Sequence, residues 1–499
     1  MTDPQTLSRR QLLAAAAALP AQAQQQSNRP NLVFLFSDQQ SYDMAGCYGN
    51  SQIQTPNIDR LATQGVRFNR CISNAPVCTP FRGLLLTGQH PLWSGALGND
   101  LQIVPGNGKY FGEVLRDAGY RLGYFGKWHL YGGDRVRPIP AGPYRYGFDG
   151  DFLTNNCTTL FDKERAYYWD EKGQRQLYGD WEPYAQTRQA MRFLDKAKQN
   201  EPFALFLSWH PPHNWQGAEK YPVPADLASL YDPASIKLRG NCQDTPERRE
   251  AYQGHMAMCT SVDTCVGWIM KKLDELGLAT NTILVFTSDH GDLLMSHGLP
   301  GNKGRVENES MHVPLLVRWP TRIQPRVSEM PIGALDLMPT LLSLLDITPP
   351  DTCHGRNLAS SIRSGKDVIA ESLPLFLMVH DWRGLYTPRY TYGYAVPSPT
   401  PNWWNRNPGR DPESHNRLYD RDTDPLEKNN LFHSPAHRKL RDELHQQTLD
   451  WMKKFGDTGL SYPEIVSRAE HEEDLDLDRR RILTRNGAGK LKGRPIDFL

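Results

Sequence analysis

The sequence predicts an α/β fold in which a mainly parallel β-sheet is covered by helices on both faces. Strand and helix signals alternate through the first two thirds of the chain. The predicted strands are short, continuous apolar runs, which is the pattern of strands buried on both faces. At 499 residues the chain is long enough for one large α/β domain and a smaller second domain.

The predicted elements follow one another in the order that this architecture requires. Capping signals and helical spacing predict three helices, which span residues 56–64, 111–118 and 246–276. Five apolar runs are the predicted strands, and they cover residues 31–36, 121–125, 203–208, 282–287 and 315–319.

The composition of the chain changes after about residue 350. Residues 387–417 are rich in Pro, Tyr, Trp, Asn and Arg, short strand candidates flank them, and a polar helix is expected near 435–454. We therefore expect a large domain, a smaller C-terminal α+β subdomain and a charged terminal segment, with bounds at 27–350, 351–460 and 461–499.

The N-terminus has the features of an export signal. The arginine pair at positions 9 and 10 precedes an alanine-rich apolar run from Leu12 to Leu19, and Ala21-Gln22-Ala23 follows as a cleavage pattern. Paired arginines are typical of a twin-arginine signal, which exports folded proteins. We expect residues 1–26 to be a removed signal peptide and the mature protein to be periplasmic or secreted. The apolar run is too short to span a bilayer.

The overall composition argues against several classes of function. Lys+Arg number 57 and Asp+Glu 56, so no global field favours nucleic acid or an anionic membrane. Eight cysteines in a chain of this length do not make a disulfide scaffold, and no Cys/His spacing indicates structural zinc. We therefore expect a small-molecule partner, no nucleic acid and no membrane span.

Polar side chains cluster at the ends of the predicted strands. Ligands of open α/β sheets bind beyond the carboxyl ends of the strands, so these groups can converge although they are far apart in the sequence. The residues, in strand order, are Asp38, then Lys127 and His129, then His210 and His213, then Asp289 and His290.

These residue types suit a metal-assisted reaction on an anion. Asp38 and Asp289, with neighbouring amide or imidazole groups, would make an oxygen-rich site for a hard divalent cation. Lys127, Lys303 and the histidines would surround an anion with positive charge and proton donors. Cys78 stands at the start of a predicted helix beside an arginine, a setting that activates a thiol. The residues alone indicate a hydrolase of an anionic ester with a cysteine-derived nucleophile.

Several sequence blocks resemble the sulfatase family of the alkaline phosphatase superfamily. Cys78-Thr79-Pro80-Phe81-Arg82 is similar to the C-x-P-x-R signature, in which the cysteine is oxidised to formylglycine. The likeness extends over about residues 29–431 in the order of the family. The other similar blocks are Arg29 to Asp38, Thr55 to Ala62, Gly126-Lys127-Trp128-His129-Leu130, Thr287 to Asp292, and Leu418 to Leu431.

The resemblance implies an alkaline-phosphatase-like fold, with a large mixed β-sheet between helices and a smaller C-terminal α+β domain. It implies a sulfuric ester hydrolase of the EC 3.1.6 type, which releases inorganic sulfate from an organic ester. The nucleophile would be one hydroxyl of the gem-diol of 3-oxoalanine (formylglycine) made from Cys78, and the second hydroxyl would expel sulfate. A formylglycine-generating maturation enzyme would then be a partner, and one Ca²⁺ ion a cofactor.

The resemblance also assigns roles to the residues at the strand ends. The metal ligands would be Asp38, Gln39, Asp289 and His290, together with the oxygen of residue 78. Arg82 would support the formylglycine and the metal carboxylates. Lys127 and Lys303 would bind sulfate oxygens, and His129 would take the proton that breaks down the intermediate. His213 would bind sulfate or act as the leaving-group acid, and His210 is the alternative, nearer the substrate.

The chain departs from the common family pattern at several positions. Asp38-Gln39 stands where many members have two aspartates, and with His290 in place of an asparagine this resembles the branch that uses Asp, Gln, Asp and His. One fewer negative charge retunes a cation site. Phe81 replaces the usual serine of the signature, and His312 stands where an arginine is common.

Two other functions compete with the sulfatase interpretation: a phosphonate monoester or phosphodiester hydrolase of the same superfamily, and a non-catalytic binding protein with the same fold. Within the sulfatase interpretation, export and the many aromatic residues favour a sulfated carbohydrate. The pairs Trp209 and Trp215, and Trp403 and Trp404, could stack on sugar rings, and ordinary packing is the alternative explanation for them.

Overall fold

The computed structural model describes residues 29–465, except 102, 104–107, 133–134, 199–200, 216–220, 299–301 and 399–414. The predicted signal peptide, the tryptophan pair at 403 and 404 and almost all of the charged segment 461–499 lie outside the described residues. Among the described residues, no helix is both long enough and apolar enough to cross a membrane.

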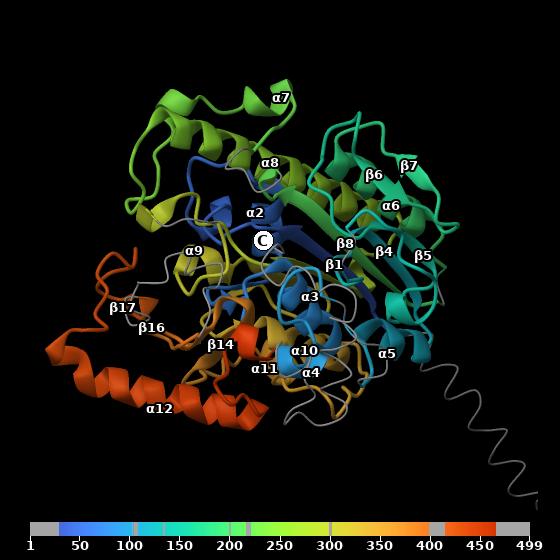
Figure 1. The fold of residues 1–499 in the computed structure, drawn as a ribbon. Helices are drawn as coiled ribbons and strands as arrows, with labels where there is room; N and C mark the ends of the chain where they lie inside the picture. Colours follow the sequence, from blue (N-terminus) through green and yellow to red (C-terminus); the bar gives the residue numbers. More distant parts are fainter. Residues whose placement is uncertain are drawn as a thin grey trace, which may run out of the picture.

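A ten-stranded mixed sheet forms the centre of the molecule (Figure 1), with the order β12-β2-β11-β9-β1-β8-β4-β5-β6-β7. Its central strands β9, β1, β8 and β4 run parallel to one another. These four are Thr282–Ser288, Asn31–Asp38, Phe203–Pro212 and Arg121–Lys127. The others are β2 (Val66–Phe68), β5 (Asp151–Asn155), β6 (Tyr167–Trp169), β7 (Arg175–Leu177), β11 (Leu315–Arg318) and β12 (Arg326–Ser328).

Helices cover both faces of this sheet, as predicted. Alternate residues of β1 enter two separate apolar clusters: Phe34 packs on the side of α3, α5 and α10, and Leu35 on the side of α2, α6 and α8. The bounds of these helices are α2 Pro56–Thr63, α3 Cys78–Thr87, α5 Phe111–Asp117, α6 Glu182–Asp195, α8 Pro246–Glu275 and α10 Ala334–Leu344. Shorter helices are α4 (Pro91–Ser94), α7 (Ala225–Ala228), α9 (Asn308–Met311) and α11 (Ala359–Ser364).

A smaller antiparallel sheet with the order β14-β15-β16-β17 packs against α12 in the C-terminal part of the chain. Its strands and helix are β14 Leu373–Leu377, β15 Trp382–Tyr386, β16 Tyr390–Ala395, β17 Arg417–Asp420 and α12 Arg438–Phe455. A third, three-stranded sheet contains β10 (His312–Val313), β3 (Cys71–Ile72) and β13 (Ile332–Gly333). The α/β fold class, with its mixed large sheet and smaller α+β domain, is confirmed.

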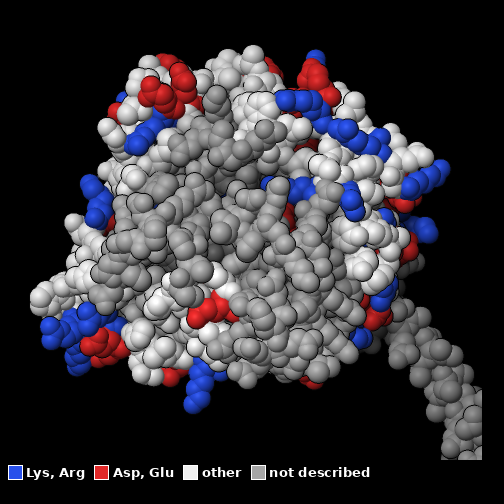
Figure 2. Space-filling model, in the orientation of Figure 1, with Lys and Arg blue, Asp and Glu red and all other residues white. Residues whose placement is uncertain are grey.

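The structure differs from the sequence predictions in two details that concern the site. The predicted strand 315–319 is β11, and it runs antiparallel to β9, so the sheet is less uniformly parallel than predicted. Strand β8 continues to Pro212, so His210 lies inside this strand and not beyond its end. On the face in Figure 2, basic and acidic side chains are interspersed over the visible described surface, in keeping with the near-zero net charge.

Candidate active site

Cys78 is the first residue of α3, and every residue of this helix is buried. Pro80 stands in the first turn, where the missing N–H of proline costs no intrahelical hydrogen bond. Only 1% of the Cys78 surface is exposed. Its Sγ atom lies 3.2 Å from His290 Nε2, 3.6 Å from Asp38 Oδ1 and 3.1 Å from Lys303 Nζ. The residues predicted to converge from distant parts of the sequence therefore meet at Cys78.

Two carboxylates, an imidazole and the Cys78 thiol form a group that could hold a metal ion. One ligand atom each from Asp38, Asp289, His290 and Cys78 lie within 4.8 Å of one another. Asp38 is the last residue of β1, and Asp289 and His290 directly follow β9, the parallel neighbour of β1. The Arg82 guanidinium, one turn into α3, lies 3.3 Å from an oxygen of Asp38 and 3.3 Å from an oxygen of Asp289. This buried cation offsets the repulsion between the two carboxylates.

Gln39 lies beside this group, and its side-chain amide is held in one orientation. Its Nε2 donates to Asn214 Oδ1 at 3.1 Å and to Asp292 Oδ2 at 2.7 Å. Its Oε1 is buried and has no hydrogen-bond partner among the described residues. Because both amide hydrogens are engaged, the carbonyl oxygen is left as an unpaired acceptor, which is a ligand type that hard cations prefer.

Lys127 ends β4 and donates from Nζ to Asp38 Oδ2. The preceding residue, Gly126, has a φ of +95°, and a Cβ there would collide with the Ser208 carbonyl of β8, so only glycine fits. Burial raises the pKa of Asp38. The positive charges of Lys127 and the nearby histidines lower this pKa by more than burial raises it, so the carboxyl group stays ionised. Burial and the Asp38 charge raise the pKa of Asp289 above its usual value.

Positive charge from two lysines converges on Cys78. Burial raises the pKa of the thiol, but Lys127 and Lys303 lower it well below its usual value. Lys303 Nζ also lies 2.7 Å from His213 Nε2, while Nδ1 of this histidine lies 2.6 Å from the Asn214 carbonyl oxygen. Burial and Lys303 lower the pKa of His213, so its neutral imidazole accepts from the ammonium group. The surroundings of residue 78 therefore suit an anion.

His129 is paired with a carboxylate that the sequence analysis did not single out. Its Nε2 lies 3.0 Å from Asp100 Oδ1, and Arg135 donates to both oxygens of Asp100 at 2.8 and 2.7 Å. Burial lowers the pKa of His129, but the Cys157 thiol and Asp100 raise it to about 10. The pair is therefore an ion pair, with an imidazolium beside a carboxylate.

His210 is paired with a second carboxyl group, that of Glu182 at the start of α6. His210 Nδ1 lies 3.1 Å from Glu182 Oε1, and both side chains are fully buried. Burial raises the pKa of Glu182 well above its usual value, and burial with Lys127 lowers that of His210 well below. Both groups are therefore neutral. The ring of Phe161 lies against the His210 ring, with 5.9 Å between centroids.

Two of the departures from the family pattern have packing explanations. Phe81 is 1% exposed, and its ring centroid lies 6.4 Å from that of Phe36 in the core beneath α3. The His312 ring stacks on Tyr42 at 3.8 Å, and burial lowers its pKa to about 3, so it is a neutral packing residue. A charged group does not replace the usual arginine at that position.

The two described tryptophans considered for sugar stacking differ. Trp209 in β8 is fully buried, and its Nε1 donates to Thr187 Oγ1 of α6. Trp209 is therefore a packing residue, and it is not accessible for stacking on a sugar ring. Trp215, in contrast, is only partly buried and lines a cavity.

The sequence reasoning missed the side chains that orient the predicted ones. Asp100 and Arg135 hold His129, Glu182 contacts His210, and Asp292 with Asn214 holds Gln39. Asp292 belongs to the family block Thr287 to Asp292, so its position near the metal-binding group could have been predicted from the sequence. Asp100, Arg135 and Glu182 lie in segments without any motif that we singled out, and tertiary placement alone reveals them.

The fold and the site define a hydrolase of the alkaline phosphatase type, with its nucleophile position at the N-terminus of a buried helix and a cation-binding group at the adjacent strand ends. Family comparison makes this specific. The sulfatase family model matches residues 30–347, and the model for the C-terminal region of N-sulphoglucosamine sulphohydrolase matches residues 297–454. The chain belongs to the sulfatase family and is a sulfuric ester hydrolase.

Individual relatives agree with this assignment. An ulvan-active sulfatase from Formosa agariphila is 31% identical over 449 residues, which cover 87% of this chain and 83% of the relative. An endo-4-O-sulfatase from Bacteroides thetaiotaomicron is 26% identical, over 88% of this chain and 94% of the relative. Among solved structures, a sulfatase-family protein from Bacteroides fragilis has a TM-score of 0.76 and 31% identity, over 87% of this chain and 97% of its own.

The fold is also shared with an enzyme of different specificity. A phosphonate monoester hydrolase from Agrobacterium radiobacter has a TM-score of 0.67 at 18% identity, over 86% of this chain and 96% of its own. At this identity the likeness concerns the fold alone.

Proposed function

We propose that this enzyme releases sulfate from a sulfated carbohydrate, with a formylglycine made from Cys78 as the nucleophile and one Ca²⁺ ion as the cofactor. The observation that carries the proposal is the position of Cys78 Sγ. It lies within 3.6 Å of Asp38 Oδ1, His290 Nε2 and Lys303 Nζ. The sulfur stands in for the oxygen atoms that the modified residue would place there.

The residues present fit a calcium ion. The carboxylates of Asp38 and Asp289 supply hard oxygen ligands, and the orphaned Oε1 of Gln39 supplies another. His290 and the oxygen of residue 78 would complete the proposed ligand set. Gln39 stands where many relatives have a second, charged carboxylate, and its amide is uncharged. We therefore expect the cation to bind more weakly and exchange more easily than in a site with three carboxylates.

The hydrated aldehyde would supply the attacking hydroxyl at neutral pH, and the cation would withdraw charge from it and from a sulfate oxygen. Arg82 would keep the two carboxylates in place at their other edge, since it contacts both. Lys127 and Lys303 would hold sulfate oxygens, in a buried setting where such contacts are strong. His213 would donate a proton to the leaving alcohol, because a bound sulfate ester would offset the repulsion by Lys303 that lowers its pKa.

His129 would accept the proton from residue 78 when sulfate leaves. This role needs the neutral imidazole, whereas Asp100 and Cys157 favour the imidazolium. Oxidation of Cys78 would leave both Asp100 and Cys157 in place. We therefore propose that this step limits the rate on the acid side of the pH profile. His210, which lies beside Glu182, would contact the substrate.

Several findings support a carbohydrate substrate and an exported enzyme. The names of the two relatives compared above refer to a polysaccharide and to a 4-O-sulfate position, and one of them is active on ulvan. The N-terminal arginine pair and apolar run support export through the twin-arginine route. We also propose the domain bounds given above, 27–350 for the catalytic domain and 351–460 for the C-terminal subdomain.

The test begins with protein expressed together with a formylglycine-generating enzyme. Peptide mass spectrometry around residue 78 should find the aldehyde, and a panel of sulfated saccharides should yield free sulfate. Cys78→Ala should be folded and inactive. Chelation should abolish activity, and Ca²⁺ should restore it. An unmodified thiol in active protein would contradict the mechanism.

Parallel assays with an aryl sulfate and an aryl phosphodiester separate the competing activity. A strong preference for the diester would replace our proposal by a phosphodiester hydrolase. Activity confined to small aryl sulfates, with none on the saccharide panel, would overturn the carbohydrate assignment and leave the reaction type intact.

A further inference from the structure

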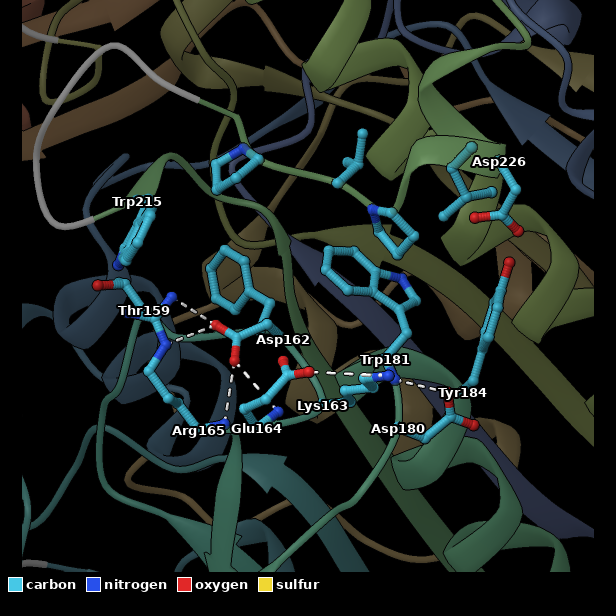
Figure 3. A pocket seen from close by; sticks show the side chains of 15 residues that line it. Thr159, Asp162, Lys163, Glu164, Arg165, Asp180, Trp181, Tyr184, Trp215 and Asp226 are labelled. Atoms are coloured by element: carbon cyan, nitrogen blue, oxygen red, sulfur yellow. Dashed lines mark hydrogen bonds and ion pairs between the residues drawn. The ribbon is translucent and has the colours of Figure 1, made fainter.

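A cavity of about 440 Å³ lies between the segment 159–165, Trp181, Tyr184 and helix α7 (Figure 3), and this size is typical of a small-molecule site. Phe161 lies on its wall and packs against the His210 ring. Trp181, which precedes Glu182, lies on the same wall, and its ring is 6.3 Å from that of Phe161. The cavity and the candidate active site therefore share a wall.

The cavity is also close to the reacting group along the chain. Trp215 lines it and follows His213 by two residues, a separation of at most about 7 Å between Cα atoms. His213 Nε2 is 2.7 Å from Lys303 Nζ, which is 3.1 Å from Cys78 Sγ. A chemical group bonded to a sulfated ring at residue 78 could thus reach this cavity.

The walls of the cavity combine aromatic surfaces with polar groups, a mixture that suits a sugar ring. Eight of the fifteen lining residues are aromatic or aliphatic, and aromatic faces can pack on the apolar faces of pyranose rings. The indole N–H groups of Trp181 and Trp215 are buried and have no acceptor among the described residues. Buried donors of this kind gain most from an added acceptor oxygen. Figure 3 shows Tyr184 and Asp226 across the cavity from Trp215, so polar groups stand at both ends.

The charges around the cavity argue against an anionic occupant. Its two basic residues are already engaged: Arg165 pairs with Asp162 at 2.6 Å and covers the Trp215 ring at 4.5 Å, and Lys163 lies 3.7 Å from Glu164. Acidic lining residues outnumber basic ones, because Asp180 and Asp226 also belong to the lining. A carboxylate or a second sulfate would meet net repulsion here.

We propose that this cavity binds an uncharged pyranose ring that neighbours the sulfated ring of the substrate. The inference rests on the proposed carbohydrate sulfatase function and adds a substrate class to it. The enzyme would favour glycans in which the sulfated ring is joined to a neutral sugar, and it would reject a hexuronic acid at the same place.

The first experiment changes the cavity from helix α7, away from the reacting residues. Leu227 is 7% exposed and lines the cavity, whereas Leu230 is 41% exposed and lies just beyond the same helix. Leu227→Arg should lower the ratio of kcat/KM for the best saccharide of the panel to that for 4-nitrophenyl sulfate at least tenfold. The matched control Leu230→Arg should leave this ratio within about twofold. Thermal melting checks that both variants fold, and Tyr184→Ala is the substitute if Leu227→Arg does not.

The second experiment tests the charge of the occupant. Two disaccharides carry the same galactose sulfate, joined to glucose in one and to glucuronic acid in the other. Wild-type enzyme should prefer the glucose compound at least tenfold in kcat/KM, and Leu227→Arg should reduce this preference. An unchanged ratio in Leu227→Arg and Tyr184→Ala, or equal use of both disaccharides, would overturn the proposal. If the wild-type enzyme released no sulfate from any saccharide of the panel, the proposed carbohydrate sulfatase function would be refuted instead.

Discussion

Two histidine–carboxyl pairs lie within the electrostatic influence of Lys127, and they are in opposite charge states although the distance between their partners is nearly the same. His210 and Glu182 lie 3.1 Å apart, and His129 and Asp100 lie 3.0 Å apart. The first pair is neutral and the second is ionic, as the directions of their pKa shifts show.

The difference arises from what surrounds each carboxyl group. Asp100 accepts two hydrogen bonds from Arg135, whose side chain is 42% exposed and thus keeps its charge hydrated. Glu182 is fully buried, and no arginine or lysine among the described residues donates a hydrogen bond to its carboxyl group. A distance between two groups therefore does not define their protonation, because desolvation without a compensating charged donor neutralises both.

The largest effect should come from removing the cation that both pairs share. Lys127 lowers the pKa of His129 and of His210, and it contacts Asp38. Lys127→Ala should lower kcat/KM about 10²- to 10³-fold, since a preorganised donor to the sulfate is lost. Steady-state kinetics with an aryl sulfate measures it. Lys127→Arg is the control for charge, and equal activity of Lys127→Ala and wild type would contradict the role.

Breaking the ionic pair should have the next largest effect. Asp100→Asn should lower kcat/KM about 10- to 100-fold, because His129 loses its orienting partner. The substitution removes an anion, so the pKa of His129 should fall. If neutral His129 accepts the proton, the acid limb of the pH–rate profile moves to lower pH. A shift of the alkaline limb instead would mean that His129 acts as a cation.

Replacing the neutral pair's carboxyl should matter little for rate and more for stability. Glu182→Gln should retain activity within about threefold, because the pair carries no charge to lose. The folded-state pKa of Glu182 is above its unfolded value near 4.5, so its contribution to stability is complete below that pH and is lost as pH rises towards the folded pKa. The free energy of unfolding of Glu182→Gln, measured relative to that of the wild type, should therefore be higher at pH 9 than at pH 5 by at least about 1 kcal/mol. Denaturant unfolding at both pH values measures this, and an equal difference at both would refute it.

The smallest effect should come from the partly exposed arginine that makes one pair ionic. Arg135→Gln should lower activity about threefold, as expected for an ion pair open to solvent. The substitution removes a cation, so the pKa of His129 should rise and the acid limb of the pH–rate profile should move slightly to higher pH, opposite to the shift in Asp100→Asn. In the double variant with Asp100→Asn, Arg135→Gln should add nothing, which a double-mutant cycle checks.

The same comparison shows how far the sequence could predict the site. Asp38, Cys78, Lys127 and Asp289 stand at strand ends or a helix start within distinctive blocks, so local pattern predicts both their position and their convergence. Strand β8 was predicted too short because its apolar run ends at Ser208, and so His210 was placed beyond it.

The protonation partners could not be predicted. Asp100 and Glu182 have no local signal, because their effect depends on burial and on neighbours that tertiary packing brings near. The direction of β11 was missed for a similar reason, since an apolar run predicts a strand and not its orientation.

The complete burial of α3 also sets an order of events in the life of the protein. A modifying enzyme needs Cys78 and its neighbours as accessible chain, yet after folding the thiol is 1% exposed and Arg82 is packed against two carboxylates. The proposed oxidation therefore has to happen before the central sheet closes over the helix. Folding and the proposed maturation would then compete for the same newly made chain, and their relative rates would determine the fraction of modified enzyme. A molecule that folds first would keep a buried cysteine at position 78 and would lack the proposed nucleophile. Export of an already folded protein would then carry this outcome unchanged across the membrane.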